Sequence, residues 1–199
     1  GSTFHSAKFQ GAKFCKYAGF EDTVFSSYAQ FSHAHFVGKA SFTNIRFKGH
    51  ARFEEAEFEE GAYFWSLKNG RTIFDCDAYF NNAKFHKNVT FHSAEFCSKA
   101  DFQLTNFNGE HVQFLGVNFK DESDFKGAQF KGKALFRKAK FYGLANFQLA
   151  HFKEDAYFQD IMFIEGAQAN FTETKFDGDV AFVRSLFSDS VTFIGTRFN

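Results

Sequence analysis

The chain has 199 residues, of which 23 are basic (Lys and Arg) and 23 are acidic, so its formal net charge at pH 7 is +0. This balance excludes a bulk electrostatic attraction to nucleic acid or to an anionic bilayer. No apolar run approaches the ~18 residues of a membrane span, and no signal peptide is recognisable at the start. The cysteines, Cys15, Cys76 and Cys97, are odd in number, which argues against a disulfide framework and favours a reducing, cytoplasmic location.

The first two residues, Gly1 and Ser2, come without an initiator Met and resemble a cloning scar. We therefore interpret residues 1–3 as a cloning scar or terminal segment that lies outside the predicted domain. Because one internal repeat runs from end to end, we expect residues 4–199 to form a single domain. Within that domain the sequence predicts one inserted loop, at residues 65–73.

Phenylalanine recurs after alternating steps of five and six residues through the first third of the chain. The positions are Phe9, Phe14, Phe20, Phe25, Phe31, Phe36, Phe42, Phe47, Phe53, Phe58 and Phe64. Two residues before the 35 phenylalanines of the whole chain stand twenty alanines, and otherwise only Ser, Thr, Val or Ile. None of the 23 basic, 23 acidic or 8 histidine residues falls in either column. Both columns are therefore predicted to form the structural core.

Two inward positions separated by one outward residue indicate a very short extended segment, since side chains two residues apart share a face. Such segments are too short for a hairpin sheet, and they fit the sides of a stacked coil with a corner after each side. Glycine often follows the phenylalanine by two residues, at Gly11, Gly38, Gly49 and Gly132. We expect corners with positive φ at these glycines.

The repeating unit resembles that of the pentapeptide repeat proteins, in which a small residue stands two positions before a central Leu or Phe. Residues 7–11 (Ala-Lys-Phe-Gln-Gly) and 12–14 (Ala-Lys-Phe) show this unit unchanged. The resemblance covers nearly the whole chain and implies an all-β fold, a right-handed quadrilateral parallel β-helix with four units per coil. This chain adds a sixth residue at every second corner, which gives 22 residues per coil and about nine coils.

The largest break in the rhythm is the step of ten residues from Phe64 to Phe74. It fits either two ordinary sides, with Asn69 in place of a phenylalanine, or one corner with a five-residue loop, and we favour the loop. The segment has the composition of a protein contact, with Trp65, Lys68, Asn69 and Arg71 as candidate contact residues. A tolerated insertion without a partner is the simpler interpretation.

Two smaller breaks lie at residues 108–113, with one extra residue, and at residues 164–170, with two. Both fall at corners that are already long, where an additional residue disturbs the coil least. We expect bulges at both places.

Sequence patterns of catalysis or metal binding are missing. Neither Cys-x-x-Cys nor His-Glu-x-x-His occurs, and no nucleophile elbow, phosphate loop or dinucleotide fingerprint is present. His33 and His35 flank Ala34, and we interpret them as surface histidines. Because side chains fill the interior of the predicted coil, we expect no enzyme, no cofactor and no metal.

Some pentapeptide repeat proteins resemble DNA in shape and charge and bind type II topoisomerases, so the acidic run of this chain is relevant. The run comprises Glu54, Glu55, Glu57, Glu59 and Glu60. One coil earlier the corresponding positions carry His33 and His35, and one coil later Lys84 and His86, so the patch is predicted to be local.

The function that the sequence favours is a non-catalytic repeat scaffold whose outer faces bind another protein. The alternative is a DNA-mimicking binder of type II topoisomerase (gyrase) that gives quinolone protection. No nucleic-acid or membrane partner is expected. Since the repeat continues to Phe193 and Phe198 without a cap, we also expect that one end pairs with a second copy as an end-to-end homodimer or with another domain.

Overall fold

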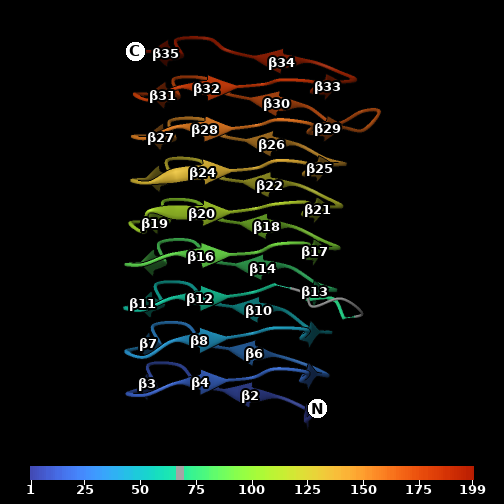
Figure 1. Ribbon diagram of the computed structural model, residues 1–199. Helices are drawn as coiled ribbons and strands as arrows, with labels where there is room; N and C mark the ends of the chain where they lie inside the picture. Colours follow the sequence, from blue (N-terminus) through green and yellow to red (C-terminus); the bar gives the residue numbers. More distant parts are fainter. Residues whose placement is uncertain (66–69) are drawn as a thin grey trace.

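In the computed structural model of residues 1–199, the described residues, 1–65 and 70–199, form 35 strands of two or three residues and no helix. The chain winds around four parallel sheets, A to D, and each turn places one strand in each sheet (Figure 1). Sheets A, B and C have nine strands and sheet D has eight, so the predicted quadrilateral solenoid of about nine coils is confirmed.

Sheets A and C hold strands that end on a phenylalanine. Sheet A contains β1 (Thr3–Phe4), β5 (Val24–Phe25), β9 (Arg46–Phe47), β13 (Ile73–Phe74), β17 (Glu95–Phe96), β21 (Asn118–Phe119), β25 (Lys140–Phe141), β29 (Met162–Phe163) and β33 (Leu186–Phe187). Sheet C contains β3 (Lys13–Phe14), β7 (His35–Phe36), β11 (Glu57–Phe58), β15 (Lys84–Phe85), β19 (Asn106–Phe107), β23 (Gln129–Phe130), β27 (His151–Phe152), β31 (Lys175–Phe176) and β35 (Arg197–Phe198).

Sheets B and D hold strands that start on, or contain, the small inward residue. Sheet B contains β2 (Ala7–Lys8), β6 (Ala29–Gln30), β10 (Ala51–Arg52), β14 (Ala78–Tyr79), β18 (Ala100–Asp101), β22 (Ser123–Asp124), β26 (Ala145–Asn146), β30 (Ala169–Asn170) and β34 (Val191–Thr192). Sheet D contains β4 (Ala18–Gly19), β8 (Ala40–Ser41), β12 (Ala62–Tyr63), β16 (Val89–Thr90), β20 (His111–Gln113), β24 (Lys133–Leu135), β28 (Ala156–Tyr157) and β32 (Val180–Ala181).

The phenylalanine rings stack in register from coil to coil and fill the interior. Phe36 and Phe58, paired in sheet C, have ring centroids 4.7 Å apart and an interplanar angle of 0°. Rings on the opposite sides B and D meet edge to face, as Phe42 and Phe53 do at 5.2 Å and 86°. Both arrangements are favourable for aromatic quadrupoles, so each ring is held along its column and across the coil.

The predicted core residues lie inside the coil. Eight of them are fully buried: Phe25, Phe31, Phe36, Phe42, Phe47, Phe53, Phe58 and Phe64. The first three, Phe9, Phe14 and Phe20, are partly buried and pack against this core from the first coil. The small residues two positions earlier, such as Ala29 and Ala51, are fully buried and leave the space that the rings occupy.

Two kinds of corner alternate around each coil. Short corners join sheet B to C and sheet D to A, and each closes with a tight turn such as the hydrogen bond from Ala34 N to Phe31 O at 3.0 Å. Long corners join sheet A to B and sheet C to D, and they carry the sixth residue. Positive φ occurs at the short corners, two residues after the phenylalanine, as at His33 with φ 58°.

The glycine prediction holds only in part. Gly11 has φ 63° at a short corner, as expected. Gly38, Gly49 and Gly132 lie at long corners, and none of them has a positive φ. A Cβ on Gly38 would lie 2.5 Å from the carbonyl carbon of Lys16 in the coil below. Close approach of successive coils, and not backbone handedness, therefore explains these three glycines, whereas Gly166 in the 164–168 break has φ 85°.

The insertion after Phe64 spans a single corner. Phe64 follows β12 in sheet D, and β13 with Phe74 lies in sheet A, the next side of the coil. Phe74 pairs with Phe47, so the ladder continues in register beyond the insertion. The other two breaks lie at long corners: residues 108–110 precede β20, and residues 164–168 project beyond β29 (Figure 1).

Truncation of a central ring tests this packing. Phe102 is fully buried, with ring centroids 4.9 Å from both Phe80 and Phe125. Phe102→Ala should lower the free energy of unfolding by about 3–5 kcal/mol, because the rigid coils cannot collapse into the cavity. Urea denaturation followed by circular dichroism measures the loss. Phe198→Ala, at a ring that is 55% exposed, is the control and should cost far less; equal losses would contradict the packing.

Candidate functional site

In the described part of the chain, phenylalanine rings and small residues fill the interior, so we look for candidate sites on the outer faces. At the predicted contact loop, Trp65 is half-buried, and its carbonyl oxygen holds the insertion to the scaffold. That oxygen accepts a hydrogen bond from Thr72 Oγ1 at 2.7 Å and another from the backbone N of Asn44 at 3.2 Å. Both ends of the insertion are therefore tied to the ladder.

One of the two cations of the predicted loop, Arg71, is already engaged. Arg71 is exposed, and its Nη1 donates to Oε2 of Glu95 in the next coil at 2.8 Å. Lys68 and Asn69 lie outside the described residues. A role of this loop in protein contact remains a prediction.

The acidic run does not form one continuous surface. Glu54 faces outward from the sheet B side, where its carboxylate accepts from Arg52 Nη1 at 3.0 Å. Glu55 takes the positive-φ position of a short corner, 3.4 Å from Nδ1 of His33. The short corner between sheets B and C thus divides the neighbouring carboxylates between different faces of the coil.

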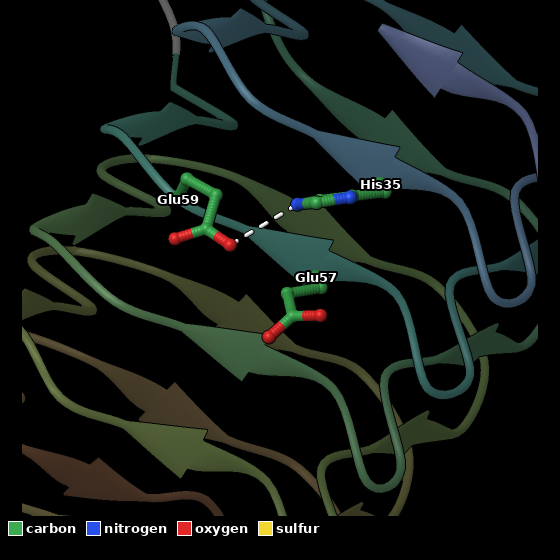
Figure 2. Close-up of side chains that lie close together, drawn as sticks. All are labelled: His35, Glu57 and Glu59. Atoms are coloured by element: carbon green, nitrogen blue, oxygen red, sulfur yellow. Dashed lines mark hydrogen bonds and ion pairs between the residues drawn. The ribbon is translucent and has the colours of Figure 1, made fainter. Parts of the chain in front are cut away.

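Glu57 and Glu59 project from sheet C among histidines, as Figure 2 shows for His35. Glu57 pairs in register with His35 of the coil before and with Lys84 of the coil after. His35 Nε2 lies 3.1 Å from Glu59 Oε1, and His86 Nε2 lies 2.8 Å from Glu57 Oε1. The hydrogen bond from His86 lowers the pKa of Glu57 although partial burial opposes it, so this carboxylate is ionised at neutral pH.

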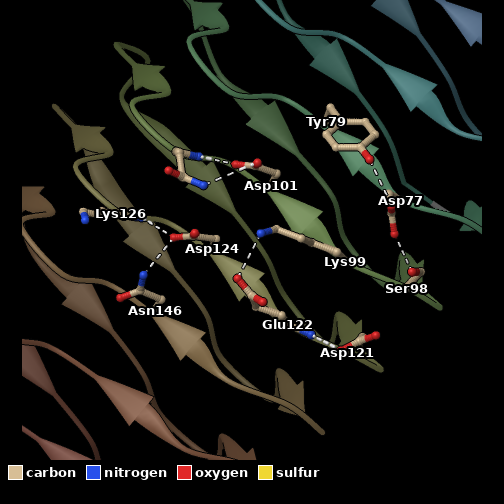
Figure 3. Close-up of polar contacts among 11 residues, drawn as sticks. Asp77, Tyr79, Ser98, Lys99, Asp101, Asp121, Glu122, Asp124, Lys126 and Asn146 are labelled. Atoms are coloured by element: carbon tan, nitrogen blue, oxygen red, sulfur yellow. Dashed lines mark hydrogen bonds and ion pairs between the residues drawn. The ribbon is translucent and has the colours of Figure 1, made fainter.

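A column of aspartates and asparagines follows sheet B (Figure 3). Asp101 and Asp124 are paired in register, and their side-chain oxygens accept from the backbone N of Gln103 and Lys126, each at 3.0 Å. Asn146 continues the column and donates from Nδ2 to Asp124 Oδ1 at 3.0 Å. Burial raises the pKa of both aspartates, and the charge of Asp101 raises that of Asp124 further.

An apolar surface covers the late strands of sheet A, around β25, β29 and β33. We call it the sheet A patch, and it comprises Tyr142, Leu144, Met162, Ile164 and Leu186. Met162 pairs in register with Leu186, and these two side chains are 37% and 53% exposed. Tyr142 and Leu144 are also exposed, whereas Ile164 is half-buried beside them.

In earlier coils the same column of sheet A mixes charged side chains with the half-buried Val24 and Ile73. Arg46 and Glu95 occupy the positions that Met162 and Leu186 take later, and Arg46 donates to Asp75 at 2.8 Å. Among the described residues of this column, the apolar side chains are exposed only at the end of the sheet, at Met162 and Leu186. Sequence reasoning missed this patch, although counting one coil length along the outward positions would have found it.

Open hollows run along the long corner between sheets C and D. Their walls are polar and charged, and they include Asn108, Gly109, Glu110, His111, Lys131 and Lys133. The extra residue of the 108–113 break lengthens β20 at this place, and β24 pairs with it over three residues. These hollows lie on the outside of the filled coil.

The fold defines a parallel β-solenoid with a phenylalanine-filled interior. A family model described as pentapeptide repeats (9 copies) matches residues 125–168. The coils on both sides of this segment have the same four sheets and the same stacked columns. The chain is a pentapeptide repeat protein, and proteins of this family are generally non-catalytic repeat scaffolds. No curated protein and no solved structure matches the chain.

The described residues contain no helix that is long enough and apolar enough to cross a membrane.

The stacked aspartates of sheet B generate a pH-dependent prediction. Because the pKa of each is raised on folding, the ionised pair destabilises the folded protein as pH rises through those values. Asp124→Asn should therefore increase the free energy of unfolding at pH 7 by roughly 0.2–1 kcal/mol, the usual range for like charges on paired strands. At pH 3, below the usual carboxyl pKa of about 3.9, the gain should vanish.

Urea denaturation at both pH values measures this effect. The matched control is Asp121→Asn, an exposed aspartate in the same coil, which should change stability by less than about 0.5 kcal/mol. A loss of stability in Asp124→Asn at pH 7, or a gain that persists at pH 3, would show that the two carboxylates do not repel each other.

Proposed function

We propose that this protein is a scaffold that binds another protein through the sheet A patch. The observation that carries the proposal is the group of exposed apolar side chains, Tyr142, Leu144, Met162 and Leu186, on a flat and rigid sheet. Contiguous apolar surface of this kind marks interaction sites in folded proteins. Flat sheets also offer a preformed surface, so little conformational entropy is lost on binding.

The surroundings of the patch support a protein partner. Polar groups border it: Lys140 precedes Met162 in the same column, and the projecting residues 164–168 include exposed Glu165. Lys120 Nζ lies 4.1 Å from the centroid of the Tyr142 ring. An apolar centre with a polar rim and an aromatic residue is the usual anatomy of protein interfaces.

A cytoplasmic location accompanies this proposal. Cys15, Cys76 and Cys97 are all free thiols. Burial raises the pKa of the Cys97 thiol, which keeps it protonated and poorly reactive. Free thiols at the surface fit a reducing compartment.

The alternative of a DNA-mimicking topoisomerase binder has weaker support. Mimicry of DNA needs a continuous stripe of negative charge, because duplex DNA carries a charge at every step along its axis. The carboxylates of Glu57 and Glu59 instead stand beside His35, His86 and Lys84. The negative surface is therefore interrupted in both directions along sheet C.

Site-specific crosslinking tests the proposed patch. With p-benzoylphenylalanine in place of Met162, the protein expressed in its native cells should crosslink to one discrete partner. Leu186→Lys in the same chain should abolish that product, because an ammonium group would be desolvated in the interface. Immunoblotting of the crosslinked species is the measurement.

The matched control places the photoreactive residue at Lys48, an outward position of sheet A five coils earlier, where we expect no product. Thermal melting verifies that each variant is folded. A product of unchanged yield in the Leu186→Lys protein, or equal yields from positions 48 and 162, would contradict the proposed patch.

A second copy of this chain is the other candidate partner, and exposed rings of the last described coil favour it. Phe193, Ile194 and Phe198 are 38%, 72% and 55% exposed. If two copies stack through this end, sedimentation velocity should show a dimer that dissociates on dilution. Ile194→Lys should then weaken the dimer by about tenfold or more, and Val183→Lys, at the opposite short corner, should weaken it less. A monomer at all concentrations would contradict end-to-end pairing.

A further inference from the structure

A cluster of three metal-ligating side chains stands on sheet C, separate from the sheet A patch. His35 projects from β7, and Glu57 and Glu59 project from β11 and the residue just beyond it (Figure 2). One imidazole nitrogen and one oxygen from each carboxylate all lie within 4.8 Å of one another. Among the residues that the structure describes, this is the one group of three that meets this spacing.

We propose that His35, Glu57 and Glu59 bind a divalent transition metal ion of the zinc class. In a tetrahedral site with bonds of about 2.0–2.2 Å, neighbouring ligand atoms are about 3.3 Å apart. His35 Nε2 and Glu59 Oε1 are already 3.1 Å apart, so an ion fits after small changes in the side-chain torsions. The third ligand atom, from Glu57, lies within 4.8 Å of both.

The donor set selects the class of metal. Two carboxylates supply a formal charge of −2 and hard oxygen atoms, whereas the imidazole supplies a borderline nitrogen. Ca²⁺ and Mg²⁺ prefer sites made of oxygen only, and an imidazole favours zinc, copper, nickel or iron. Water would complete the coordination on the solvent side, since all three side chains are half-exposed.

His86 takes the role of a positioning residue. Its Nε2 lies 2.8 Å from Oε1 of Glu57, the same oxygen that lies 3.9 Å from Lys84 Nζ. Both contacts use Oε1, so Oε2 of Glu57 is left for the ion. Hydrogen bonds to a ligating carboxylate from outside the site hold it in place and typically change metal affinity by about 10–100-fold.

The scaffold explains why this site is rigid and why it is local. His35, Glu57 and Lys84 stand in one column on adjacent paired strands, with spacing fixed by the backbone ladder. Further along sheet C, His151 Nε2 lies 2.6 Å from Asp177 Oδ2, but no third ligand joins this pair among the described residues. The His151 and Asp177 pair therefore serves as an internal comparison.

Zinc titration of the full chain tests the proposal. Isothermal titration calorimetry with ZnCl₂ at pH 7.5 should show one tight event per chain. His35→Gln and Glu59→Gln should each weaken it by at least about tenfold, and His86→Gln by about tenfold, since it removes only the support of Glu57. His33→Gln, on the other side of Ala34, and Asp177→Asn are the matched controls and should leave the affinity unchanged.

Two further readouts separate this site from the thiols and from a fold defect. Zinc-edge X-ray absorption should show nitrogen and oxygen ligands only. Zinc should raise the melting temperature of the wild type and not of the His35→Gln/Glu59→Gln double variant, whose metal-free melting temperature should match the wild type. Equal zinc affinity of the wild type and the double variant, or sulfur ligands in the absorption spectrum, would overturn the proposal.

Discussion

The in-register stacking of phenylalanine rings is the interaction on which the rest of the structure depends. Parallel strands repeat every 4.7–4.9 Å, and stacked aromatic rings are favourable at nearly the same spacing. The pair Phe130 and Phe152, at 4.5 Å, and the pair Phe102 and Phe125, at 4.9 Å, show the match. One coil of chain therefore returns each ring to the same place above the last, and the backbone ladder and the core reinforce each other.

This constraint determines where the sequence is free to vary. A change of length inside a side would move a phenylalanine out of its column, so all three breaks in the rhythm lie at corners. After the insertion that follows Phe64, the chain returns to register at Phe74. Phe74 pairs with Phe47 in the same way that phenylalanines of uninterrupted coils pair. Because the columns fill the interior, chemistry and binding are left to the outward positions.

The inward pattern made the fold predictable, since the small residue, the phenylalanine and the exclusion of charge all indicated the same coil. The conformation of the corners was less predictable. Among the residues that the structure describes, twelve other than glycine adopt positive φ: Asp22, His33, Asn44, Glu55, Asn82, Ser93, Leu104, Lys138, Leu149, Asp160, Glu173 and Arg184. Local propensity disfavours most of these choices. Hydrogen bonds to the adjacent coil, such as Leu104 N to Lys126 O at 2.9 Å, impose the conformation instead.

For the surface sites, the sequence predicts which residues lie near one another, but it does not predict how their side chains are arranged. Counting along the coil brings Glu57 beside His35 and Lys84, but the sequence does not show which rotamers bring three ligand atoms together. For the sheet A patch the signal was present in the outward column of Lys140, Met162 and Leu186. The acidic run and the single Trp are features of consecutive residues along the chain. A surface of the solenoid is instead built from residues about one coil apart in sequence.

The most direct test of the continuous register is a distance measured across the insertion. Spin labels at Ser26→Cys and Tyr142→Cys, in a chain with the native cysteines changed to serine, lie on one outward column of sheet A. They are five coils apart, so pulsed electron paramagnetic resonance should give a narrow distribution near about 24 Å, with each coil contributing ~4.8 Å. A broad distribution, or a centre displaced by the ~10 Å that separates facing sheets, would contradict a phenylalanine ladder that stays in register.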